Sequence, residues 1–169
     1  MSTEQLIELF HHRWAPPALA LIAERRGARF VELQRGLGVG RDSLRRALDA
    51  LVEQGLVRAN EGYGHPLRPE YVVSATGRGA AAAATRVLAA GPADVLLRKW
   101  SVPVLAEIGD GRRFSELRAS LGGVTPRALA LALQDLEAAG FVRREVLPTR
   151  PPSSVYRPTV RGRRIADAL

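Results

Sequence analysis

The chain has 169 residues, enough for one domain or two small ones. Its 24 Arg and one Lys outnumber 17 Asp and Glu, which gives a net charge of +8. This excess fits a solvated surface or an anionic partner, and arginine suits nucleic acid because its planar fork pairs with phosphate and guanine edges. The absence of Cys excludes disulfides, zinc fingers, iron–sulfur clusters and thiol redox sensing. No signal peptide and no run of ~18 apolar residues is present, so we expect a cytoplasmic protein with no membrane partner.

Four helices are predicted before the first strand. Ser2 or Thr3 can cap a first helix that runs to Trp14, and the pair Pro16 and Pro17 begins a second one, because proline is tolerated in a first turn. The second, third and fourth helices are predicted over 18–24, from Phe30 to an end near Gly36 to Gly40, and over 41–54.

A hairpin and a rigid connection follow the fourth helix. Strands are predicted over 56–60 and 71–74, and the loop between them carries Tyr63, His65 and Arg68 at its tip. The alanine-rich stretch from Thr76 predicts a helix to about Ala90, followed by a new helix over 93–100. We therefore expect a helical link between the halves of the chain.

Two windows of twenty residues, 39–58 and 124–143, repeat each other at an offset of 85 residues. Within each window apolar residues recur at i, i+3, i+4 and i+7, which places them on one helix face. Thr125 before Pro126 predicts a helix start, and Gly55 and Gly140 predict helix stops, because glycine takes the left-handed conformation without a Cβ clash. The matching pairs are Val39/Val124, Leu44/Leu129, Ala47/Ala132, Leu48/Leu133, Leu51/Leu136, Gly55/Gly140, Val57/Val142 and Arg58/Arg143.

The rest of the second half also follows the first. Trp100 matches Trp14, the segment 112–122 matches 28–38, and strands are predicted over 141–147 and 155–159. The predicted fold class is α+β, mainly α, with tandem winged helix-turn-helix domains arranged as a pseudo-dimer. The predicted domains are 1–78 and 92–169, joined by a helical junction over 79–91.

The second half resembles the HxlR-type winged-helix regulators. The resemblance rests on Lys99-Trp100, Arg112-Arg113-Phe114, Glu116-Leu117, Val124-Thr125-Pro126-Arg127, Leu136-Glu137, Gly140, Tyr156 and Gly162, and the first half keeps the pattern more loosely. It implies a dimeric DNA-binding transcription regulator, in which the helix that begins at Thr125-Pro126-Arg127 enters the major groove and the wing lies near the minor groove or the backbone. Such dimers read half-sites about one helical turn, ~34 Å, apart. We expect no cofactor.

The two predicted reading helices differ where DNA would touch them, because Ala130 and Leu131 occupy the places of Arg45 and Arg46. We hypothesise that Arg41, Arg45 and Arg46 make the main base and phosphate contacts. The complete set of candidate DNA-binding residues is Arg41, Ser43, Arg45, Arg46, Arg68, Thr125, Arg127 and Arg150. Surface solubility is the alternative role for each arginine. The alternative role for the second predicted reading helix, which begins at Thr125, is a ligand or partner surface.

A second hypothesis is a small-molecule binding or sequestering protein on the same scaffold, with weak or no DNA binding. Trp14, Trp100 and Leu131 are its candidate ligand residues, as an apolar lining between the halves for a hydrophobic effector. The tryptophans are alternatively core anchors. An enzyme is not predicted, because the histidines, among them the adjacent His11 and His12, form no metal-ligand spacing and no catalytic motif is present. Pairing of two chains into a homodimer stays open.

Overall fold

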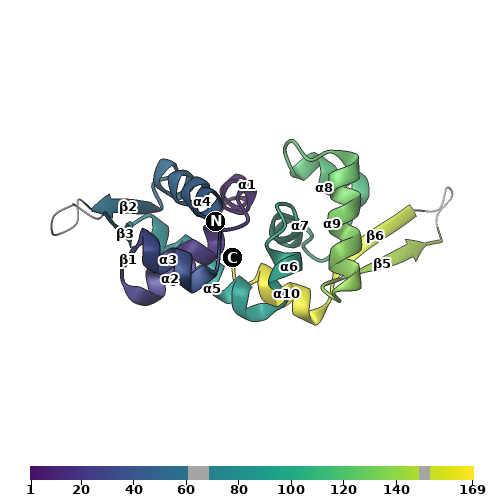
Figure 1. Ribbon diagram of the computed structural model, residues 1–169. Coiled ribbons are helices and arrows are strands. Elements are labelled where there is room, and N and C mark those ends of the chain that lie inside the picture. The colour runs from purple at the N-terminus through teal and green to yellow at the C-terminus, as the bar shows by residue number, and fades with distance from the viewer. Residues whose placement is uncertain (61–68, 149–152) are drawn as a thin grey trace. The chain divides into compact units, whose positions relative to one another are not determined.

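The computed structural model describes residues 1–60, 69–148 and 153–169, and it is mainly helical with two small antiparallel sheets. The chain divides into two compact units, each described by itself (Figure 1). Unit 1 combines Met1–Phe10 with Val87–Leu169, and unit 2 is His11–Arg86. None of the described helices is long and apolar enough to cross a lipid bilayer.

Unit 2 is built from helices that precede and follow a three-stranded sheet. Strand β3 lies in the middle of the order β1-β3-β2, with Ala28 opposite Tyr71 and Val57 opposite Val73. The elements are α2 (Ala15–Arg25), β1 (Ala28–Arg29), α3 (Phe30–Leu37), α4 (Arg41–Glu53), β2 (Val57–Asn60), β3 (Glu70–Val73) and most of α5 (Gly77–Ala90).

Helix α4 confirms the predicted apolar stripe. Leu44, Leu48 and Leu51 have no exposed surface, so the opposite face of the helix is left to solvent. Gly55 then takes a φ of 69°, which ends the helix as predicted. The Gly55 carbonyl accepts hydrogen bonds from Ser74 Oγ at 2.6 Å and Thr76 Oγ1 at 2.9 Å, so the start of α5 is tied to the end of α4.

Unit 1 has the same strand arrangement in its own sheet, β4-β6-β5, with Arg112 opposite Tyr156 and Val142 opposite Pro158. Its elements are α1 (Thr3–His11, up to Phe10), the end of α5, α6 (Ala93–Leu96), α7 (Ser101–Glu107), β4 (Arg112–Arg113), α8 (Phe114–Ser120), α9 (Pro126–Ala138), β5 (Val142–Leu147), β6 (Ser153–Pro158) and α10 (Val160–Ala166).

Helix α9 begins as the sequence predicts. Thr125 Oγ1 accepts a hydrogen bond from the Ala128 backbone N–H at 3.2 Å, and Pro126 takes the first helical position. Gly140, with a φ of 74°, ends the turn that follows the helix. The Thr159 hydroxyl donates to the Gly140 carbonyl at 2.8 Å, so α10 is tied to the end of α9.

The N-terminal helix belongs to the unit that contains the C-terminal half, which the predicted boundaries 1–78, 79–91 and 92–169 do not reflect. The Thr3 hydroxyl donates to the Glu107 carboxylate, and the Met1 ammonium donates to the Leu169 carbonyl at 3.2 Å. The apolar face of α1, formed by Leu6, Leu9 and Phe10, is buried. These contacts join segments more than 100 residues apart, which no local pattern announces.

Two helix ends differ from the prediction. Helix α1 ends at His11 instead of Trp14, and α6 ends at Leu96 instead of Trp100. Both tryptophans instead occupy the N-cap position of the next helix, where their backbone carbonyls accept the bonds from Ala18 and Val104. The short strands β1 and β4 and helix α10 were not predicted.

Candidate nucleic-acid interface

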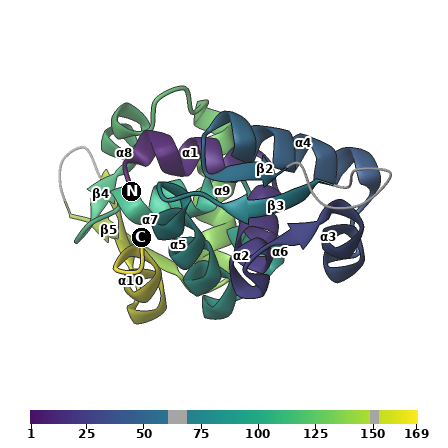
Figure 2. The same ribbon diagram turned by 90° about the vertical axis from the view of Figure 1, so that its left-hand side faces the viewer.

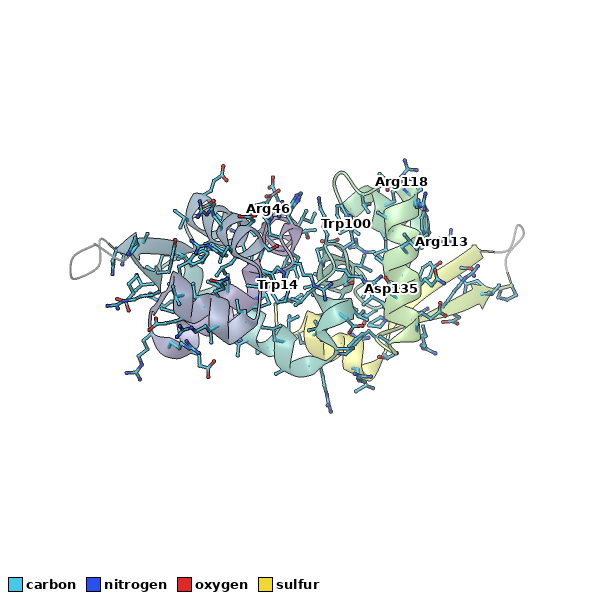
Figure 3. All side chains as sticks on the ribbon, in the orientation of Figure 1. Trp14, Arg46, Trp100, Arg113, Arg118 and Asp135 are labelled. Atoms are coloured by element: carbon cyan, nitrogen blue, oxygen red, sulfur yellow. The ribbon has the colours of Figure 1, made fainter. Side chains whose placement is uncertain are left out.

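Three arginines lie on the face of α4 that points away from the core. Arg41, Arg45 and Arg46 are exposed, and in the part of the chain that the structure describes none of them forms an ion pair with a carboxylate. Arg46 Nε donates to the Asp42 carbonyl at 3.3 Å, and Figure 3 shows Arg46 on this helix. The acids of α4, Asp42, Asp49 and Glu53, are exposed as well, but the three guanidinium groups are not engaged in ion pairs and are available to an external anion.

A groove of about 890 Å³ lies within unit 2 between α3, α4 and strand β3. Four arginines line it, Arg29, Arg35, Arg41 and Arg45, against two acids, Glu32 and Asp49. The Glu32 carboxylate already accepts the Arg29 backbone N–H at 2.6 Å, which caps α3. The groove is open, shallow and net positive, a surface that suits an extended polyanion.

Two aromatic residues help to shape this groove. The Arg41 guanidinium lies 5.8 Å from the centroid of the Phe30 ring, a cation–π contact between the starts of α4 and α3. Tyr71 enters from β3. Burial raises the pKa of Tyr71 above its usual value of 10.0, and the negative charge of Asp49 raises it further. The positive charge of Arg45 lowers this pKa, but by less. Its hydroxyl therefore stays neutral and can donate a hydrogen bond at physiological pH.

The corresponding face of α9 in unit 1 is less charged. Arg127 is exposed near the start of the helix, but Ala130 is exposed one turn later and Leu131 has 49% of its surface exposed. Thr125 acts as the N-cap of α9, so its hydroxyl already has a structural partner. An exposed leucine neutralises no phosphate, so this face offers DNA fewer charged contacts than α4.

Several arginines of unit 1 are held by carboxylates. Arg98 pairs with Asp135, which Figure 3 shows on α9. The remaining pairs, each 2.8 Å apart, are Arg112 with Glu107, Arg157 with Glu145 and Arg163 with Asp110. Arg113, directly before α8, and Arg118, in the last turn of α8, stay exposed. The positive charge of unit 1 is therefore partly neutralised within the unit.

The other predicted site residues fall into three groups. Ser43 is half-buried in the first turn of α4. Arg68 and Arg150 lie outside the described residues, so their DNA contacts stay predictions. Trp14 and Trp100 are half-buried and belong to different units, and Lys99 Nζ lies 5.1 Å from the centroid of the Trp100 ring. Their role with Leu131 in binding an effector also stays a prediction.

The sequence reasoning missed Arg29, Arg35 and Tyr71. Arg29 and Tyr71 are distant in sequence and meet because β1 pairs with β3. A signal for Arg29 was present, because it precedes Phe30 as Arg113 precedes Phe114 in the repeat. Arg35 is matched by Ala119 in the second half, so the repeat gave no signal for it. No cluster of metal-binding side chains occurs among the residues described here.

The elements of unit 1 define its class. Helices α8 and α9 form a helix-turn-helix, and the hairpin β5–β6 directly after α9 is a wing, so this unit has a winged helix-turn-helix arrangement. The family model described as HxlR-like helix-turn-helix matches residues 95–169. The chain belongs to this family of helix-turn-helix proteins.

The curated relatives are named as helix-turn-helix transcriptional regulators. An uncharacterized HTH-type transcriptional regulator, sll1512 of Synechocystis, is 42% identical over 77 residues, which cover 45% of this chain and 57% of the relative. YvaP of Bacillus subtilis, another uncharacterized HTH-type transcriptional regulator, is 34% identical over 45% of this chain and 71% of its own length. A solved MarR-family regulator from Enterococcus faecalis V583 is 31% identical, with a TM-score of 0.44, over 50% of this chain and 76% of that one. The chain thus spans a little over half the length of sll1512.

Proposed function

We propose that this chain is a transcription regulator that binds duplex DNA, with unit 2 making the strongest contacts. The observation that carries the proposal is the groove beside α4, where Arg29, Arg35, Arg41 and Arg45 surround a space of about 890 Å³. Cations on a reading helix and on the neighbouring strand can contact base edges and the adjacent phosphates together. Family membership and the regulator relatives support the same conclusion.

We also propose that the two units are tandem copies of one winged-helix module, so that a single chain acts as a pseudo-dimer. The order α2-β1-α3-α4-β2-β3-α5 matches α7-β4-α8-α9-β5-β6-α10, and the strand orders β1-β3-β2 and β4-β6-β5 correspond. The hydrogen bonds at the ends of the reading helices correspond as well, with Ser74 bound to Gly55 and Thr159 bound to Gly140.

The two modules contribute unequally to this proposed activity. Unit 2 supplies Arg41, Ser43, Arg45, Arg46 and the groove arginines, with Arg68 of the loop. Unit 1 supplies Thr125, Arg127 and Arg150, and its weaker charge makes it a secondary contact. The net charge of 11–86 is +5, from 12 Arg and 7 acids, whereas the remaining residues sum to +3, from 13 basic and 10 acidic residues.

The proposal is tested by fluorescence anisotropy of the full chain with labelled duplexes from the region that flanks its gene. We expect saturable binding that is at least 10³-fold tighter than binding to an unrelated duplex of equal length at the same salt concentration. Equal, weak binding to both duplexes would contradict a regulator that reads sequence. Absence of any binding at low salt would contradict the nucleic-acid interface itself.

A further inference from the structure

A second groove of unit 2 lies on another part of the unit, between α2, β3 and α5. It encloses about 440 Å³, and Ile22, Val72, Val73 and Ala81 give it an apolar wall. Arg26 and Arg78 line the same groove and are exposed. Figure 2 shows α2 and α5, two of the elements that line this groove, beside each other.

The corresponding groove of unit 1, between α7, β6 and α10, is lined by an exposed ion pair. It measures about 310 Å³, and two of its lining residues form the pair, with Arg163 Nη1 2.8 Å from Asp110 Oδ1. Asp167 lines this groove as well, where unit 2 has the small apolar Ala82. The unit 1 groove is therefore smaller and more polar, and its two carboxylates outnumber its one arginine.

The charged residues of the two grooves occupy matching places. Arg26 directly precedes Gly27, which has a φ of 138°, and Asp110 directly precedes Gly111, which has a φ of 144°. Each glycine leads into the first strand of its sheet. Arg26 of unit 2 therefore holds the same sequence position before the strand as Asp110 of unit 1.

Arg78 of unit 2 and Arg163 of unit 1 also occupy matching sequence positions. Arg78 follows Gly77 in α5, and Arg163 follows Gly162 in α10. A Cβ on either glycine would lie within 2.1 Å of a backbone carbonyl, that of Leu56 or Phe141, so both helices start in the same close contact. Unit 1 thus has an Arg–Asp pair where unit 2 has two arginines. Neither Arg26 nor Arg78 forms an ion pair within the described part of the chain.

The backbone at Arg26 is also unusual. Among the described residues Arg26 is the only non-glycine with a positive φ, 60°. In unit 1 the left-handed residue that follows α7 is a glycine, Gly109, with a φ of 51°. A left-handed arginine is strained, and such strained residues are often kept where their side chain has a function. A glycine or asparagine would end α2 at a lower cost.

From these observations we infer that this groove binds an organic monocarboxylate with an apolar chain. The ligand carboxylate lies between Arg26 and Arg78 and pairs with Arg78 as the Asp110 carboxylate pairs with Arg163 in unit 1. The apolar chain packs on Val72, Val73 and Ala81. This binding goes beyond the proposed function, because it does not depend on DNA.

Isothermal titration calorimetry of the full chain with octanoate, in the absence of DNA, tests the inference. We expect saturable 1:1 binding, and at least tenfold weaker binding of acetate, which lacks the chain, and of 1-octanol, which lacks the charge. Arg26→Asp reproduces the Arg–Asp pair of unit 1 and should weaken octanoate binding at least tenfold, as should Arg78→Gln. Arg13→Gln, an exposed arginine of the same unit outside the groove, should leave binding unchanged.

A folding defect is separated from a binding defect by Arg26→Gly, which removes the charge and relieves the left-handed strain. This variant should unfold at the same or a higher temperature and still lose octanoate binding at least tenfold. Octanoate affinity that is unchanged in Arg26→Gly and Arg26→Asp would overturn the inference, as would binding that does not saturate. Loss of DNA binding alone would affect only the proposed function.

Discussion

The Arg41 guanidinium lies over the ring of Phe30, 5.8 Å from its centroid, and this contact joins the first residue of α4 to the first residue of α3. A cation at a helix N-terminus is disfavoured by the helix dipole. The electron-rich ring face offsets part of that cost and holds the charge at the edge of the arginine-lined groove. Arg41 is thereby positioned for an anion outside the protein.

Replacing Arg41 with glutamine should weaken DNA binding and reduce the salt dependence by about one unit of slope, because one phosphate contact is lost. Arg41→Lys is the matched control. It keeps the charge but loses the planar fork, so affinity should fall while the slope stays the same. Anisotropy titrations across a salt series measure both quantities. Equal slopes for Arg41→Gln and the unchanged protein would contradict a phosphate contact here.

Tyr71 should make unfolding sensitive to alkaline pH. Burial, then Asp49, raises its pKa in the folded chain above 10.0, so folding favours the neutral phenol. The stabilisation is fully present below the unfolded pKa of about 10 and disappears as the pH rises through the higher folded pKa. Chemical denaturation between pH 8 and 11 should show this loss, and Tyr71→Phe should lack it.

Substitutions of the two charged neighbours of Tyr71 should shift its pKa in opposite directions. Asp49→Asn should lower the pKa of Tyr71, and Arg45→Gln should raise it, because Asp49 disfavours and Arg45 favours the phenolate. Absorbance at the phenolate band follows the titration, with Tyr71→Phe subtracted to remove the other tyrosines. Shifts in the opposite directions would show that Tyr71 does not lie between these two charges.

Gly77 should tolerate no side chain. A Cβ there would lie 2.0 Å from the Leu56 carbonyl oxygen, a backbone atom that cannot move aside without disturbing the connection to α4. Gly77→Ala should therefore lower the free energy of unfolding by roughly 3 kcal/mol. Gly79→Ala, two residues later with nothing within 4 Å, should instead be neutral or stabilise by up to about 1 kcal/mol. Urea denaturation of the two variants provides the comparison.

Introducing arginines on the exposed face of α9 should strengthen DNA binding by unit 1. Ala130 and Leu131 are exposed, so Ala130→Arg with Leu131→Arg introduces charge without creating a cavity. The double variant should increase the salt slope of DNA binding by about two and tighten binding at low salt. Unchanged stability by thermal denaturation is the control. An unchanged slope would show that this face of α9 does not approach the phosphates.

Local patterns were sufficient for the reading helices but not for their surroundings. The spacing of Leu44, Leu48 and Leu51 and the stop at Gly55 predicted α4 to within one residue, because both signals act over one or two helical turns. Helix α10 has only Val160 and Ile165 as large apolar residues, so no stripe announced it. Its start was readable in hindsight, because the Thr159 hydroxyl accepts the Gly162 backbone N–H.

The candidate site was predictable in part for the same reason. Arg41, Arg45 and Arg46 follow from helical periodicity, since residues off an apolar stripe face solvent. Tyr71 and Arg29 join them only through the β1–β3 pairing, which the sequence did not reveal. The contrast between Arg26 and Asp110 likewise became meaningful only when Arg163 was found paired with Asp110.

The most direct test of the proposed reading head is the salt dependence of DNA binding by the double variant Arg45→Gln with Arg46→Gln. Both residues are exposed on α4, so the variant should fold with unchanged stability. We predict that the slope of log Kobs against log salt becomes shallower by about two and that affinity falls at every salt concentration. Slope and affinity equal to those of the unchanged chain would contradict the assignment of α4 as the principal DNA-contacting helix.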